Sequence, residues 1–224
     1  MDIISNLEKT KEMIRRASFS VCLLAVSKTK STSQIEEAIH AGQFAFGENY
    51  VQEAAEKIQI LNQKYSNLEW HYIGRIQKNK INLLANYFDW VQTVENEEVA
   101  KKLNAACEKM NKKLNVCIQV NISEESQKGG IFIHEVNMLA SYIFEECPNL
   151  YLRGLMTIGL ATEDKVRLKM MFCQLKSCYD GLKKQYARVD TLSMGMSHDM
   201  ALAIECGSTM VRIGTAIFGE REKS

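Results

Sequence analysis

The chain has 224 residues, of which 46% are hydrophobic and 25% charged, and its formal net charge is +1. This composition is typical of one globular domain with a sizeable core, and the charge balance excludes a basic field for nucleic acid. Apolar stretches such as Val21–Val26 are far too short to cross a bilayer. The sequence therefore predicts a protein that binds neither nucleic acid nor a membrane.

The seven cysteines form no CxxC pair, their number is odd, and several lie in apolar runs. They predict reduced, mostly buried thiols in a cytoplasmic protein. The four histidines are scattered without the paired spacing of metal ligands, so no metal site is expected.

Short apolar or β-branched runs alternate with helical periodicity along the whole chain. Strands are predicted at Val21–Val26, Phe44–Gly47, Trp70–Ile73, Trp90–Val94, Val116–Asn121, Leu152–Thr157, Thr191–Ser193 and Thr209–Ile213. Helices are predicted near Asp2–Ala17, Ser33–Ala41, Val51–Asn62, Asn79–Leu84, Glu97–Met110, Ile133–Glu146, Glu163–Tyr186 and His198–Cys206. Eight strands separated by helices favour a single-domain α/β protein, a (β/α)8 TIM barrel over residues 1–224, with an open doubly wound sheet as the competing architecture.

Lys28 stands at the polar end of the first predicted strand. In a barrel, the carboxyl ends of the strands form the functional mouth. Partial desolvation and the nearby cation of Lys30 would favour a neutral, nucleophilic Lys28 amine that can condense with an aldehyde. The alternative is that the strand simply reaches the surface and ends on a charge.

The segments after the last two strands resemble an anion site. Ser193–Ser197 contains glycine and serine before a predicted helix, and Gly214-Thr215 again pairs a small residue with a hydroxyl. The loops after strands seven and eight are the usual phosphate site of such barrels. Arg212 lies between them and needs an acceptor, which could be a ligand atom or a carboxylate of Asp199 or Glu205.

An amine, two phosphate-type loops and an arginine at one mouth point to a phosphorylated aldehyde, and pyridoxal 5'-phosphate (PLP) is the obvious candidate. Lys28 would take the aldehyde, the two loops the phosphate and Arg212 the ring nitrogen. The remaining alternative is another phosphorylated metabolite, with Lys28 as a plain cation.

The chain resembles the YggS/PROSC family of pyridoxal phosphate homeostasis proteins at a series of motifs that occur in the same order. The resemblance runs from about Leu23 to Gly219 and therefore covers nearly the whole chain. The motifs are Ala25–Lys30, Phe46–Tyr50, His71–Gly74 with Gln77–Lys80, Arg153–Thr157, Ser193–Ser197 and Gly207–Gly214.

This resemblance implies a PLP fold-type III barrel like the N-terminal domain of alanine racemase, with PLP bound covalently as an aldimine on Lys28. Arg212 would face the pyridine nitrogen, and Asn49 and His71 would lie near the ring. The phosphate would be held by Ser193, Ser197, Gly214 and Thr215, with Met194 nearby. Three positions depart from the usual family pattern, namely Ser31, Arg75 and His198.

The resemblance further implies a monomer that carries PLP and delivers it to PLP-dependent apoenzymes, without robust turnover. The alternative is a small fold-type III enzyme such as an amino-acid racemase. An arginine at the ring nitrogen weakens the ring as an electron sink, and the few residues after Arg212 leave no room for the second domain of a racemase. His71 and Tyr50 are then the candidates for acid–base chemistry.

Overall fold

Eight parallel strands close into a barrel in chain order in the computed structural model, which describes residues 2–18, 20–123, 129–160 and 162–220. The open doubly wound alternative is wrong, because β1 pairs with β8 as well as with β2. The strands are β1 (Cys22–Val26), β2 (Ala45–Glu48), β3 (Glu69–Tyr72), β4 (Trp90–Val94), β5 (Leu114–Gln119), β6 (Leu150–Met156), β7 (Thr191–Ser193) and β8 (Met210–Ile213).

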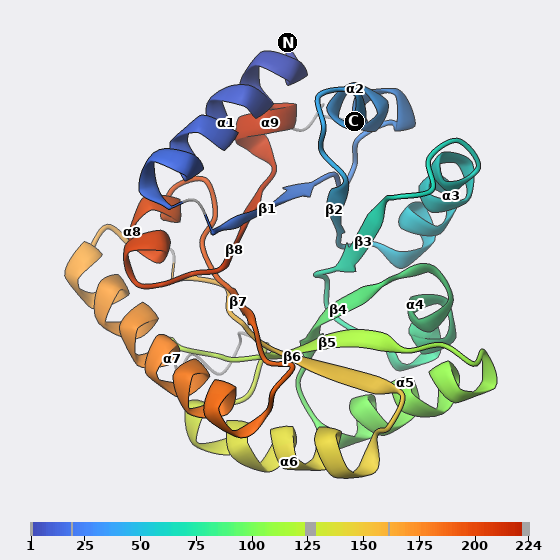
Figure 1. Cartoon of the computed structure of the whole chain (residues 1–224), viewed down its shortest axis with the longest axis vertical. Coiled ribbons are helices and arrows are strands. Elements are labelled where there is room, and N and C mark those ends of the chain that lie inside the picture. Colours follow the sequence, from blue (N-terminus) through green and yellow to red (C-terminus); the bar gives the residue numbers. More distant parts are fainter. Residues whose placement is uncertain (1, 19, 124–128, 161, 221–224) are drawn as a thin grey trace.

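The helices form a ring around the strands (Figure 1). They are α1 (Ile3–Ala17), α2 (Thr32–His40), α3 (Val51–Asn62), α4 (Ile81–Tyr87), α5 (Glu97–Lys109), α6 (Val136–Glu146), α7 (Lys165–Gln185), α8 (Met200–Glu205) and α9 (Thr215–Phe218). Short 3-10 turns η1 (Lys78–Lys80) and η2 (Ile133–Glu135) precede α4 and α6. The predicted strand and helix order is confirmed, while α9 was not predicted.

Two apolar layers hold the barrel together. The larger lies between the strands and the helices and contains Phe46, Trp70 and Phe172, all fully buried. A smaller set of apolar side chains, including Leu24 and Met210, points into the barrel. Because neighbouring residues of a strand face opposite sides, each strand supplies both layers.

Local sequence signals fix where the helices near the mouth begin. Ser31 caps α2, and its side chain and that of Gln34 each accept from the other's backbone N–H, at 3.3 Å and 3.0 Å. This capping box ends the loop that carries Lys28. At the other end of the chain, α9 packs against α1, where the Asn6 amide donates to the Ile217 carbonyl at 3.2 Å.

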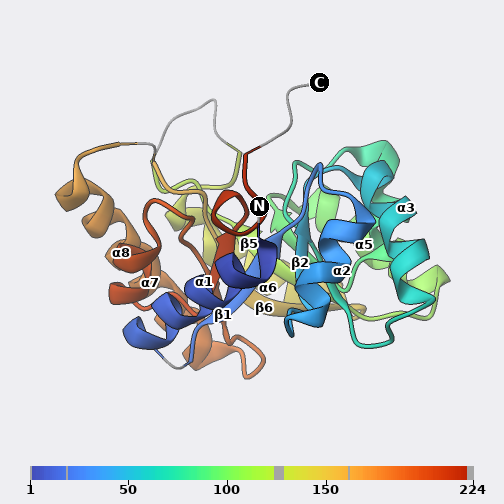
Figure 2. The same ribbon diagram turned by 90° about the horizontal axis from the view of Figure 1, so that it is seen from above.

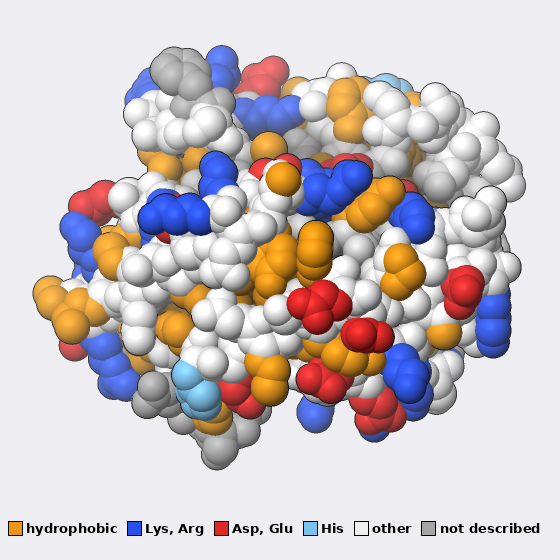
Figure 3. Space-filling model, turned by 60° about the horizontal axis from the view of Figure 1, so that its bottom comes forward, with side chains coloured by type: hydrophobic (Ala, Val, Ile, Leu, Met, Phe, Trp, Pro, Cys, Tyr) orange, Lys and Arg blue, Asp and Glu red, His pale blue; other side chains and the backbone are white. Residues whose placement is uncertain are grey.

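The surface carries no single field of charge on the face shown in Figure 3, where acidic, basic and hydrophobic side chains occur together. Figures 1 and 2 place α3 and α7 on opposite sides of the barrel. Among the helices of the described residues, none combines the length and apolar character needed to cross a membrane.

Candidate functional site: a lysine-bearing cavity at the barrel mouth

A cavity of ≈ 370 Å³ opens at the carboxyl ends of the strands. The structure brings six of the predicted site residues together in its wall, and the half-buried Lys28 is one of them. The other five are Asn49, Ser197, Arg212, Gly214 and Thr215. Apolar side chains such as Ile73 and Met156 complete the wall, so polar groups are few and localised.

Three predicted residues do not line this cavity. His71 and Ser193 are fully buried inside the barrel. The Met194 side chain is also fully buried, but it packs in the layer between strands and helices. Ser193 and Met194 therefore point to opposite sides of the barrel wall, as the alternation of a strand requires.

A chain of hydrogen bonds runs through the barrel interior and ends at Arg212. The Arg212 guanidinium donates to Ser193 Oγ at 2.8 Å, and the Ser193 hydroxyl donates to Gln92 Oε1 at 2.7 Å. The Gln92 amide donates to His71 Nδ1 at 2.9 Å, so His71 carries its proton on Nε2, which lies 2.7 Å from Glu69 Oε1. Each group donates in the same direction, from the guanidinium to the carboxylate.

Arg212 is held rigidly and carries a charge. Its Nη1 also donates to the Ser193 carbonyl at 2.8 Å, and its Nη2 donates to the Thr157 carbonyl at 2.6 Å. Burial lowers the pKa of the guanidinium to about 10, so it is protonated at neutral pH. The predicted alternative, an ion pair with Asp199 or Glu205, is not what holds it, because the guanidinium donates to two backbone carbonyls and a hydroxyl.

A buried cluster of charged side chains forms hydrogen bonds with Ser27, the residue immediately before Lys28. The Ser27 hydroxyl donates to Glu48 Oε1 at 2.6 Å, and the Lys57 ammonium donates to the Ser27 carbonyl at 2.9 Å and to Glu48 Oε1 at 3.0 Å. Burial raises the pKa of Glu48, while Lys57 and Ser27 act in the opposite direction. This cluster fixes the backbone that presents the Lys28 amine.

The same cluster reaches the residue after Lys28. Glu53 Oε1 accepts from the Thr29 backbone N–H at 2.6 Å and from Lys57 Nζ at 2.5 Å. Thr29 has φ 64°, a left-handed conformation that is uncommon for threonine and therefore needs support. Sequence analysis missed Lys57 and Glu53, although their spacing of four on one helix is the signal of an ion pair.

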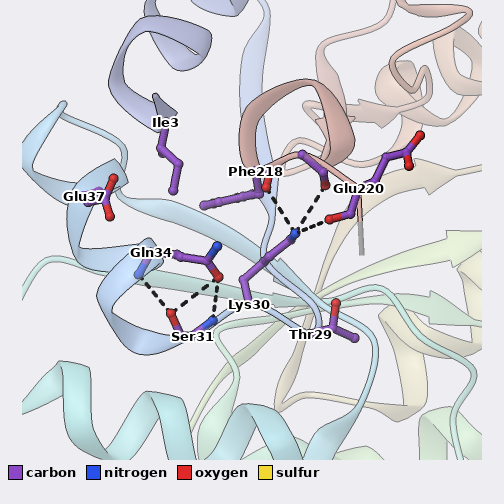
Figure 4. Close-up of a pocket in the computed structure, with 9 residues that line it drawn as sticks. Ile3, Thr29, Lys30, Ser31, Gln34, Glu37, Phe218 and Glu220 are labelled. Carbon is purple, nitrogen blue, oxygen red and sulfur yellow. Dashed lines mark hydrogen bonds between the residues drawn. The ribbon is translucent and has the colours of Figure 1, made fainter. Parts of the chain in front are cut away.

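Lys30 does not line this cavity, and its ammonium points at the carbonyls that end α9 (Figure 4). Its Nζ donates to three carbonyls, those of Phe218 at 3.1 Å, Gly219 at 3.2 Å and Glu220 at 3.0 Å. Such bonds satisfy carbonyls that a helix end leaves without partners. Lys30 thus ties the loop of Lys28 to the helix that begins at Thr215.

The sequence predicted that the loop after β7 runs directly into a helix at His198. In the structure α8 begins only at Met200. A turn intervenes in which the Met196 N–H donates to Asp199 Oδ1 at 2.5 Å. His198 lines the cavity, and its Nε2 lies 3.5 Å from Asp199 Oδ2. His198, which departs from the usual family pattern, therefore places an imidazole in the cavity wall.

One buried polar atom in this wall has no partner. Asn49 Oδ1 is buried and makes no hydrogen bond within the described structure. A buried acceptor without a partner is costly, which makes a ligand donor at this position favourable. A localised amine, a charged arginine, two hydroxyl-bearing loops and an apolar wall suit a flat, anionic, aldehyde-bearing ligand.

The family model of the alanine racemase N-terminal domain matches residues 2–222. A pyridoxal phosphate homeostasis protein of Pasteurella multocida is 50% identical over 99% of this chain and 96% of its own length. The protein of that name from Escherichia coli K12 is 46% identical over 100% of this chain and 98% of its own. The chain belongs to the YggS/PROSC family of pyridoxal phosphate homeostasis proteins, within the alanine racemase N-terminal domain class.

Solved structures agree with this assignment. PipY of Synechococcus elongatus without PLP has a TM-score of 0.88 and 32% identity, covering 95% of this chain and 99% of its own. PipY with PLP bound has a TM-score of 0.83 and 31% identity, covering 96% of this chain and 100% of its own. Alanine racemase of Clostridium difficile shares the fold, with a TM-score of 0.72 and 16% identity. The match covers 98% of this chain and 57% of the racemase.

Proposed function

We propose that this chain binds PLP in the mouth cavity, as a Schiff base on Lys28, and serves PLP homeostasis. The observation that carries the proposal is that the Lys28 amine and Arg212 share one cavity with Ser197, Gly214 and Thr215. The names of the relatives and the PLP-bound structure of PipY support it.

The residues present fit the cofactor. A volume of ≈ 370 Å³ lies in the range of small-molecule sites. Asn49 Oδ1 offers an acceptor that the protein itself leaves unused. When bound, PLP supplies an aldehyde carbon for an amine and a conjugated ring that withdraws electrons.

Within this proposal each wall residue binds a different part of the cofactor. Ser197, Gly214 and Thr215 hold the phosphate, and the Arg212 guanidinium takes the pyridine nitrogen. Ser193 acts through Arg212, to which it is bonded, and not on the phosphate. His71 and Met194 also act without touching the cofactor. His71 supports the barrel interior, and Met194 supports the wall around the loop.

We propose a carrier and not an enzyme. A charged arginine at the ring nitrogen keeps that nitrogen unprotonated, so the ring stabilises a carbanion poorly. His71 is enclosed by its own partners, and Tyr50, half exposed, precedes α3 and lies outside the cavity wall. Among the wall residues, His198 remains as a candidate for proton transfer.

The carrier would hand PLP to PLP-dependent apoenzymes in the cytoplasm. The cysteines of the described structure are free thiols, which suits that reducing compartment. We propose that the carrier is a monomer, as the resemblance to its family implies.

The proposal is tested by reconstituting the protein with PLP and following both absorbance and turnover. A visible band shifted from that of free PLP is expected, as is the absence of racemisation of single-enantiomer alanine beyond the rate with free PLP. Steady racemisation that is lost in His198→Ala would instead identify an amino-acid racemase. Absence of any shifted band would contradict PLP binding itself.

Gly74→Ala is expected to weaken PLP binding by roughly tenfold or more. A Cβ at Gly74 would lie 2.1 Å from the Asn49 carbonyl oxygen, so the backbone of Asn49 must move and carry its side chain away from the cavity. Fluorescence titration with PLP measures the effect. The matched control is Gly181→Ala, which has nothing within 4 Å and should bind PLP as the wild type does.

A further inference from the structure

Two cysteines belong to α7 and to the end of α8, on the side of the barrel away from α3 (Figures 1 and 2). Cys173 lies in the middle of α7, and Cys206 is the residue that ends α8. Their Sγ atoms are 3.3 Å apart, and both are thiols. A disulfide requires a separation of about 2.05 Å, so closure needs an approach of roughly 1.3 Å.

The two thiols are held in register by contacts on either side. One turn before Cys173, the Lys169 ammonium pairs with the Glu205 carboxylate. One turn after it, the Lys176 side chain lies against Gly207, where a Cβ would be 2.5 Å from Lys176 Cε. Residues 169, 173 and 176 share one face of α7, so three successive contacts fix this face against the turn at 205–207.

The two sulfurs differ in access. Cys173 is exposed, whereas Cys206 is 6% exposed. Burial and the neighbouring Cys173 thiol raise the pKa of Cys206 to about 12, so Cys206 is a thiol at neutral pH. Gly207, with φ 89°, follows Cys206 directly and gives the backbone freedom to adjust.

We propose that Cys173 and Cys206 form a reversible redox site that closes to a disulfide when a small disulfide oxidant, such as oxidised glutathione, reaches Cys173. The Cys173 thiolate attacks one sulfur of the oxidant, the S–S bond breaks, and one glutathione leaves as a thiol. Cys206 then gives up its proton and attacks the Cys173 sulfur, which releases the second glutathione. Two protein thiols are oxidised and one glutathione disulfide is reduced to two thiols.

This site joins α7 to the helix that supports the loop after β7. A Cβ at Gly195, within that loop, would lie 2.7 Å from Ala203 Cβ of α8, so loop and helix are in close contact. Closure of the disulfide therefore fixes α8 to α7 about one helical turn after that contact. The redox chemistry of these two thiols does not require PLP.

The test treats the full-length protein with oxidised glutathione and maps its peptides without reduction. The expected product is a cross-linked pair of peptides carrying Cys173 and Cys206, lighter by two hydrogen atoms, with two fewer titratable thiols and full reversal by dithiothreitol. Cys206→Ser should instead accumulate a glutathione adduct on Cys173. Cys178→Ser, a half-buried cysteine of the same helix, should cross-link as the wild type does.

Two results would overturn the proposal. One is a stable glutathione adduct on Cys173 in the wild type with no cross-linked peptide. The other is a cross-link of Cys173 that persists in Cys206→Ser, because a different cysteine would then be its partner. Circular dichroism of each variant confirms that it is folded before oxidation.

Discussion

Lys57→Met is expected to lower the free energy of unfolding by about 3–5 kcal/mol, as the removal of one partner from a buried ion pair does. Lys57 is 7% exposed and Glu48 is fully buried, so the Glu48 carboxylate loses its countercharge without gaining water. The Ser27 carbonyl loses a donor at the same time. Urea unfolding followed by fluorescence measures the change.

The protonation of Glu48 makes the stability loss in Lys57→Met depend on pH. Burial already raises the pKa of this carboxyl, and loss of Lys57 removes an opposing influence. A carboxyl with a raised folded-state pKa costs stability above its ordinary pKa, and the cost disappears as pH falls and the proton is taken up. The loss in Lys57→Met should therefore be smaller in mildly acidic than in mildly alkaline buffer.

Two further variants act as controls for Lys57→Met. The double variant Glu48→Gln with Lys57→Met removes the fully buried carboxylate together with its countercharge and should regain part of the lost stability. Lys64→Met removes an exposed partner of Glu36 and should change stability little, because exposed ion pairs are screened. A Lys57→Met protein as stable as Lys64→Met would show that the buried cluster does not hold the Lys28 loop.

Lys28→Ala is expected to abolish covalent retention of PLP. The proposed bond is made by the only amine in the cavity wall, so no other wall residue of the described structure can replace it. Borohydride reduction of the reconstituted protein should leave a pyridoxyl group on the peptide containing Lys28 in the wild type and none in the variant. Intact mass and peptide mapping measure both.

The matched control for Lys28→Ala is Lys30→Arg, two residues along the same loop. Arginine keeps the positive charge that faces the carbonyls at the end of α9 but does not condense with an aldehyde. This variant should retain the full pyridoxyl label. A label that is lost in Lys30→Arg and retained in Lys28→Ala would show that the Schiff base forms on Lys30 and not on Lys28.

The barrel could be predicted from the sequence because each strand is a short apolar run next to a helical period. These local signals depend on neighbouring residues and are fully present in the chain. The positions of Lys28, Arg212 and Thr215 followed, since the carboxyl ends of all strands meet at one mouth. The short helix α9 was missed because four residues give too little periodicity to detect.

The inner or outer direction of individual side chains was harder to predict. Ser193 and Met194 were both expected at the ligand, yet strand alternation sends them to opposite sides of the wall. Gln92 was missed because its partner Ser193 is distant in sequence. The bond from Lys57 to the Ser27 carbonyl was missed for the same reason, although the pairing of Lys57 with Glu53 has a local signal. Long-range pairing of polar groups leaves no local pattern to read.

The hydrogen-bonded chain from Arg212 to Glu69 polarises the inside of the barrel along its axis. Its cationic end lies at the mouth and its carboxylate, 48% exposed, lies at the opposite rim. Fields from buried charges are screened less than those of surface charges. A protein whose net charge is only +1 therefore has an electrically positive floor at the mouth, which favours the binding of an anion there.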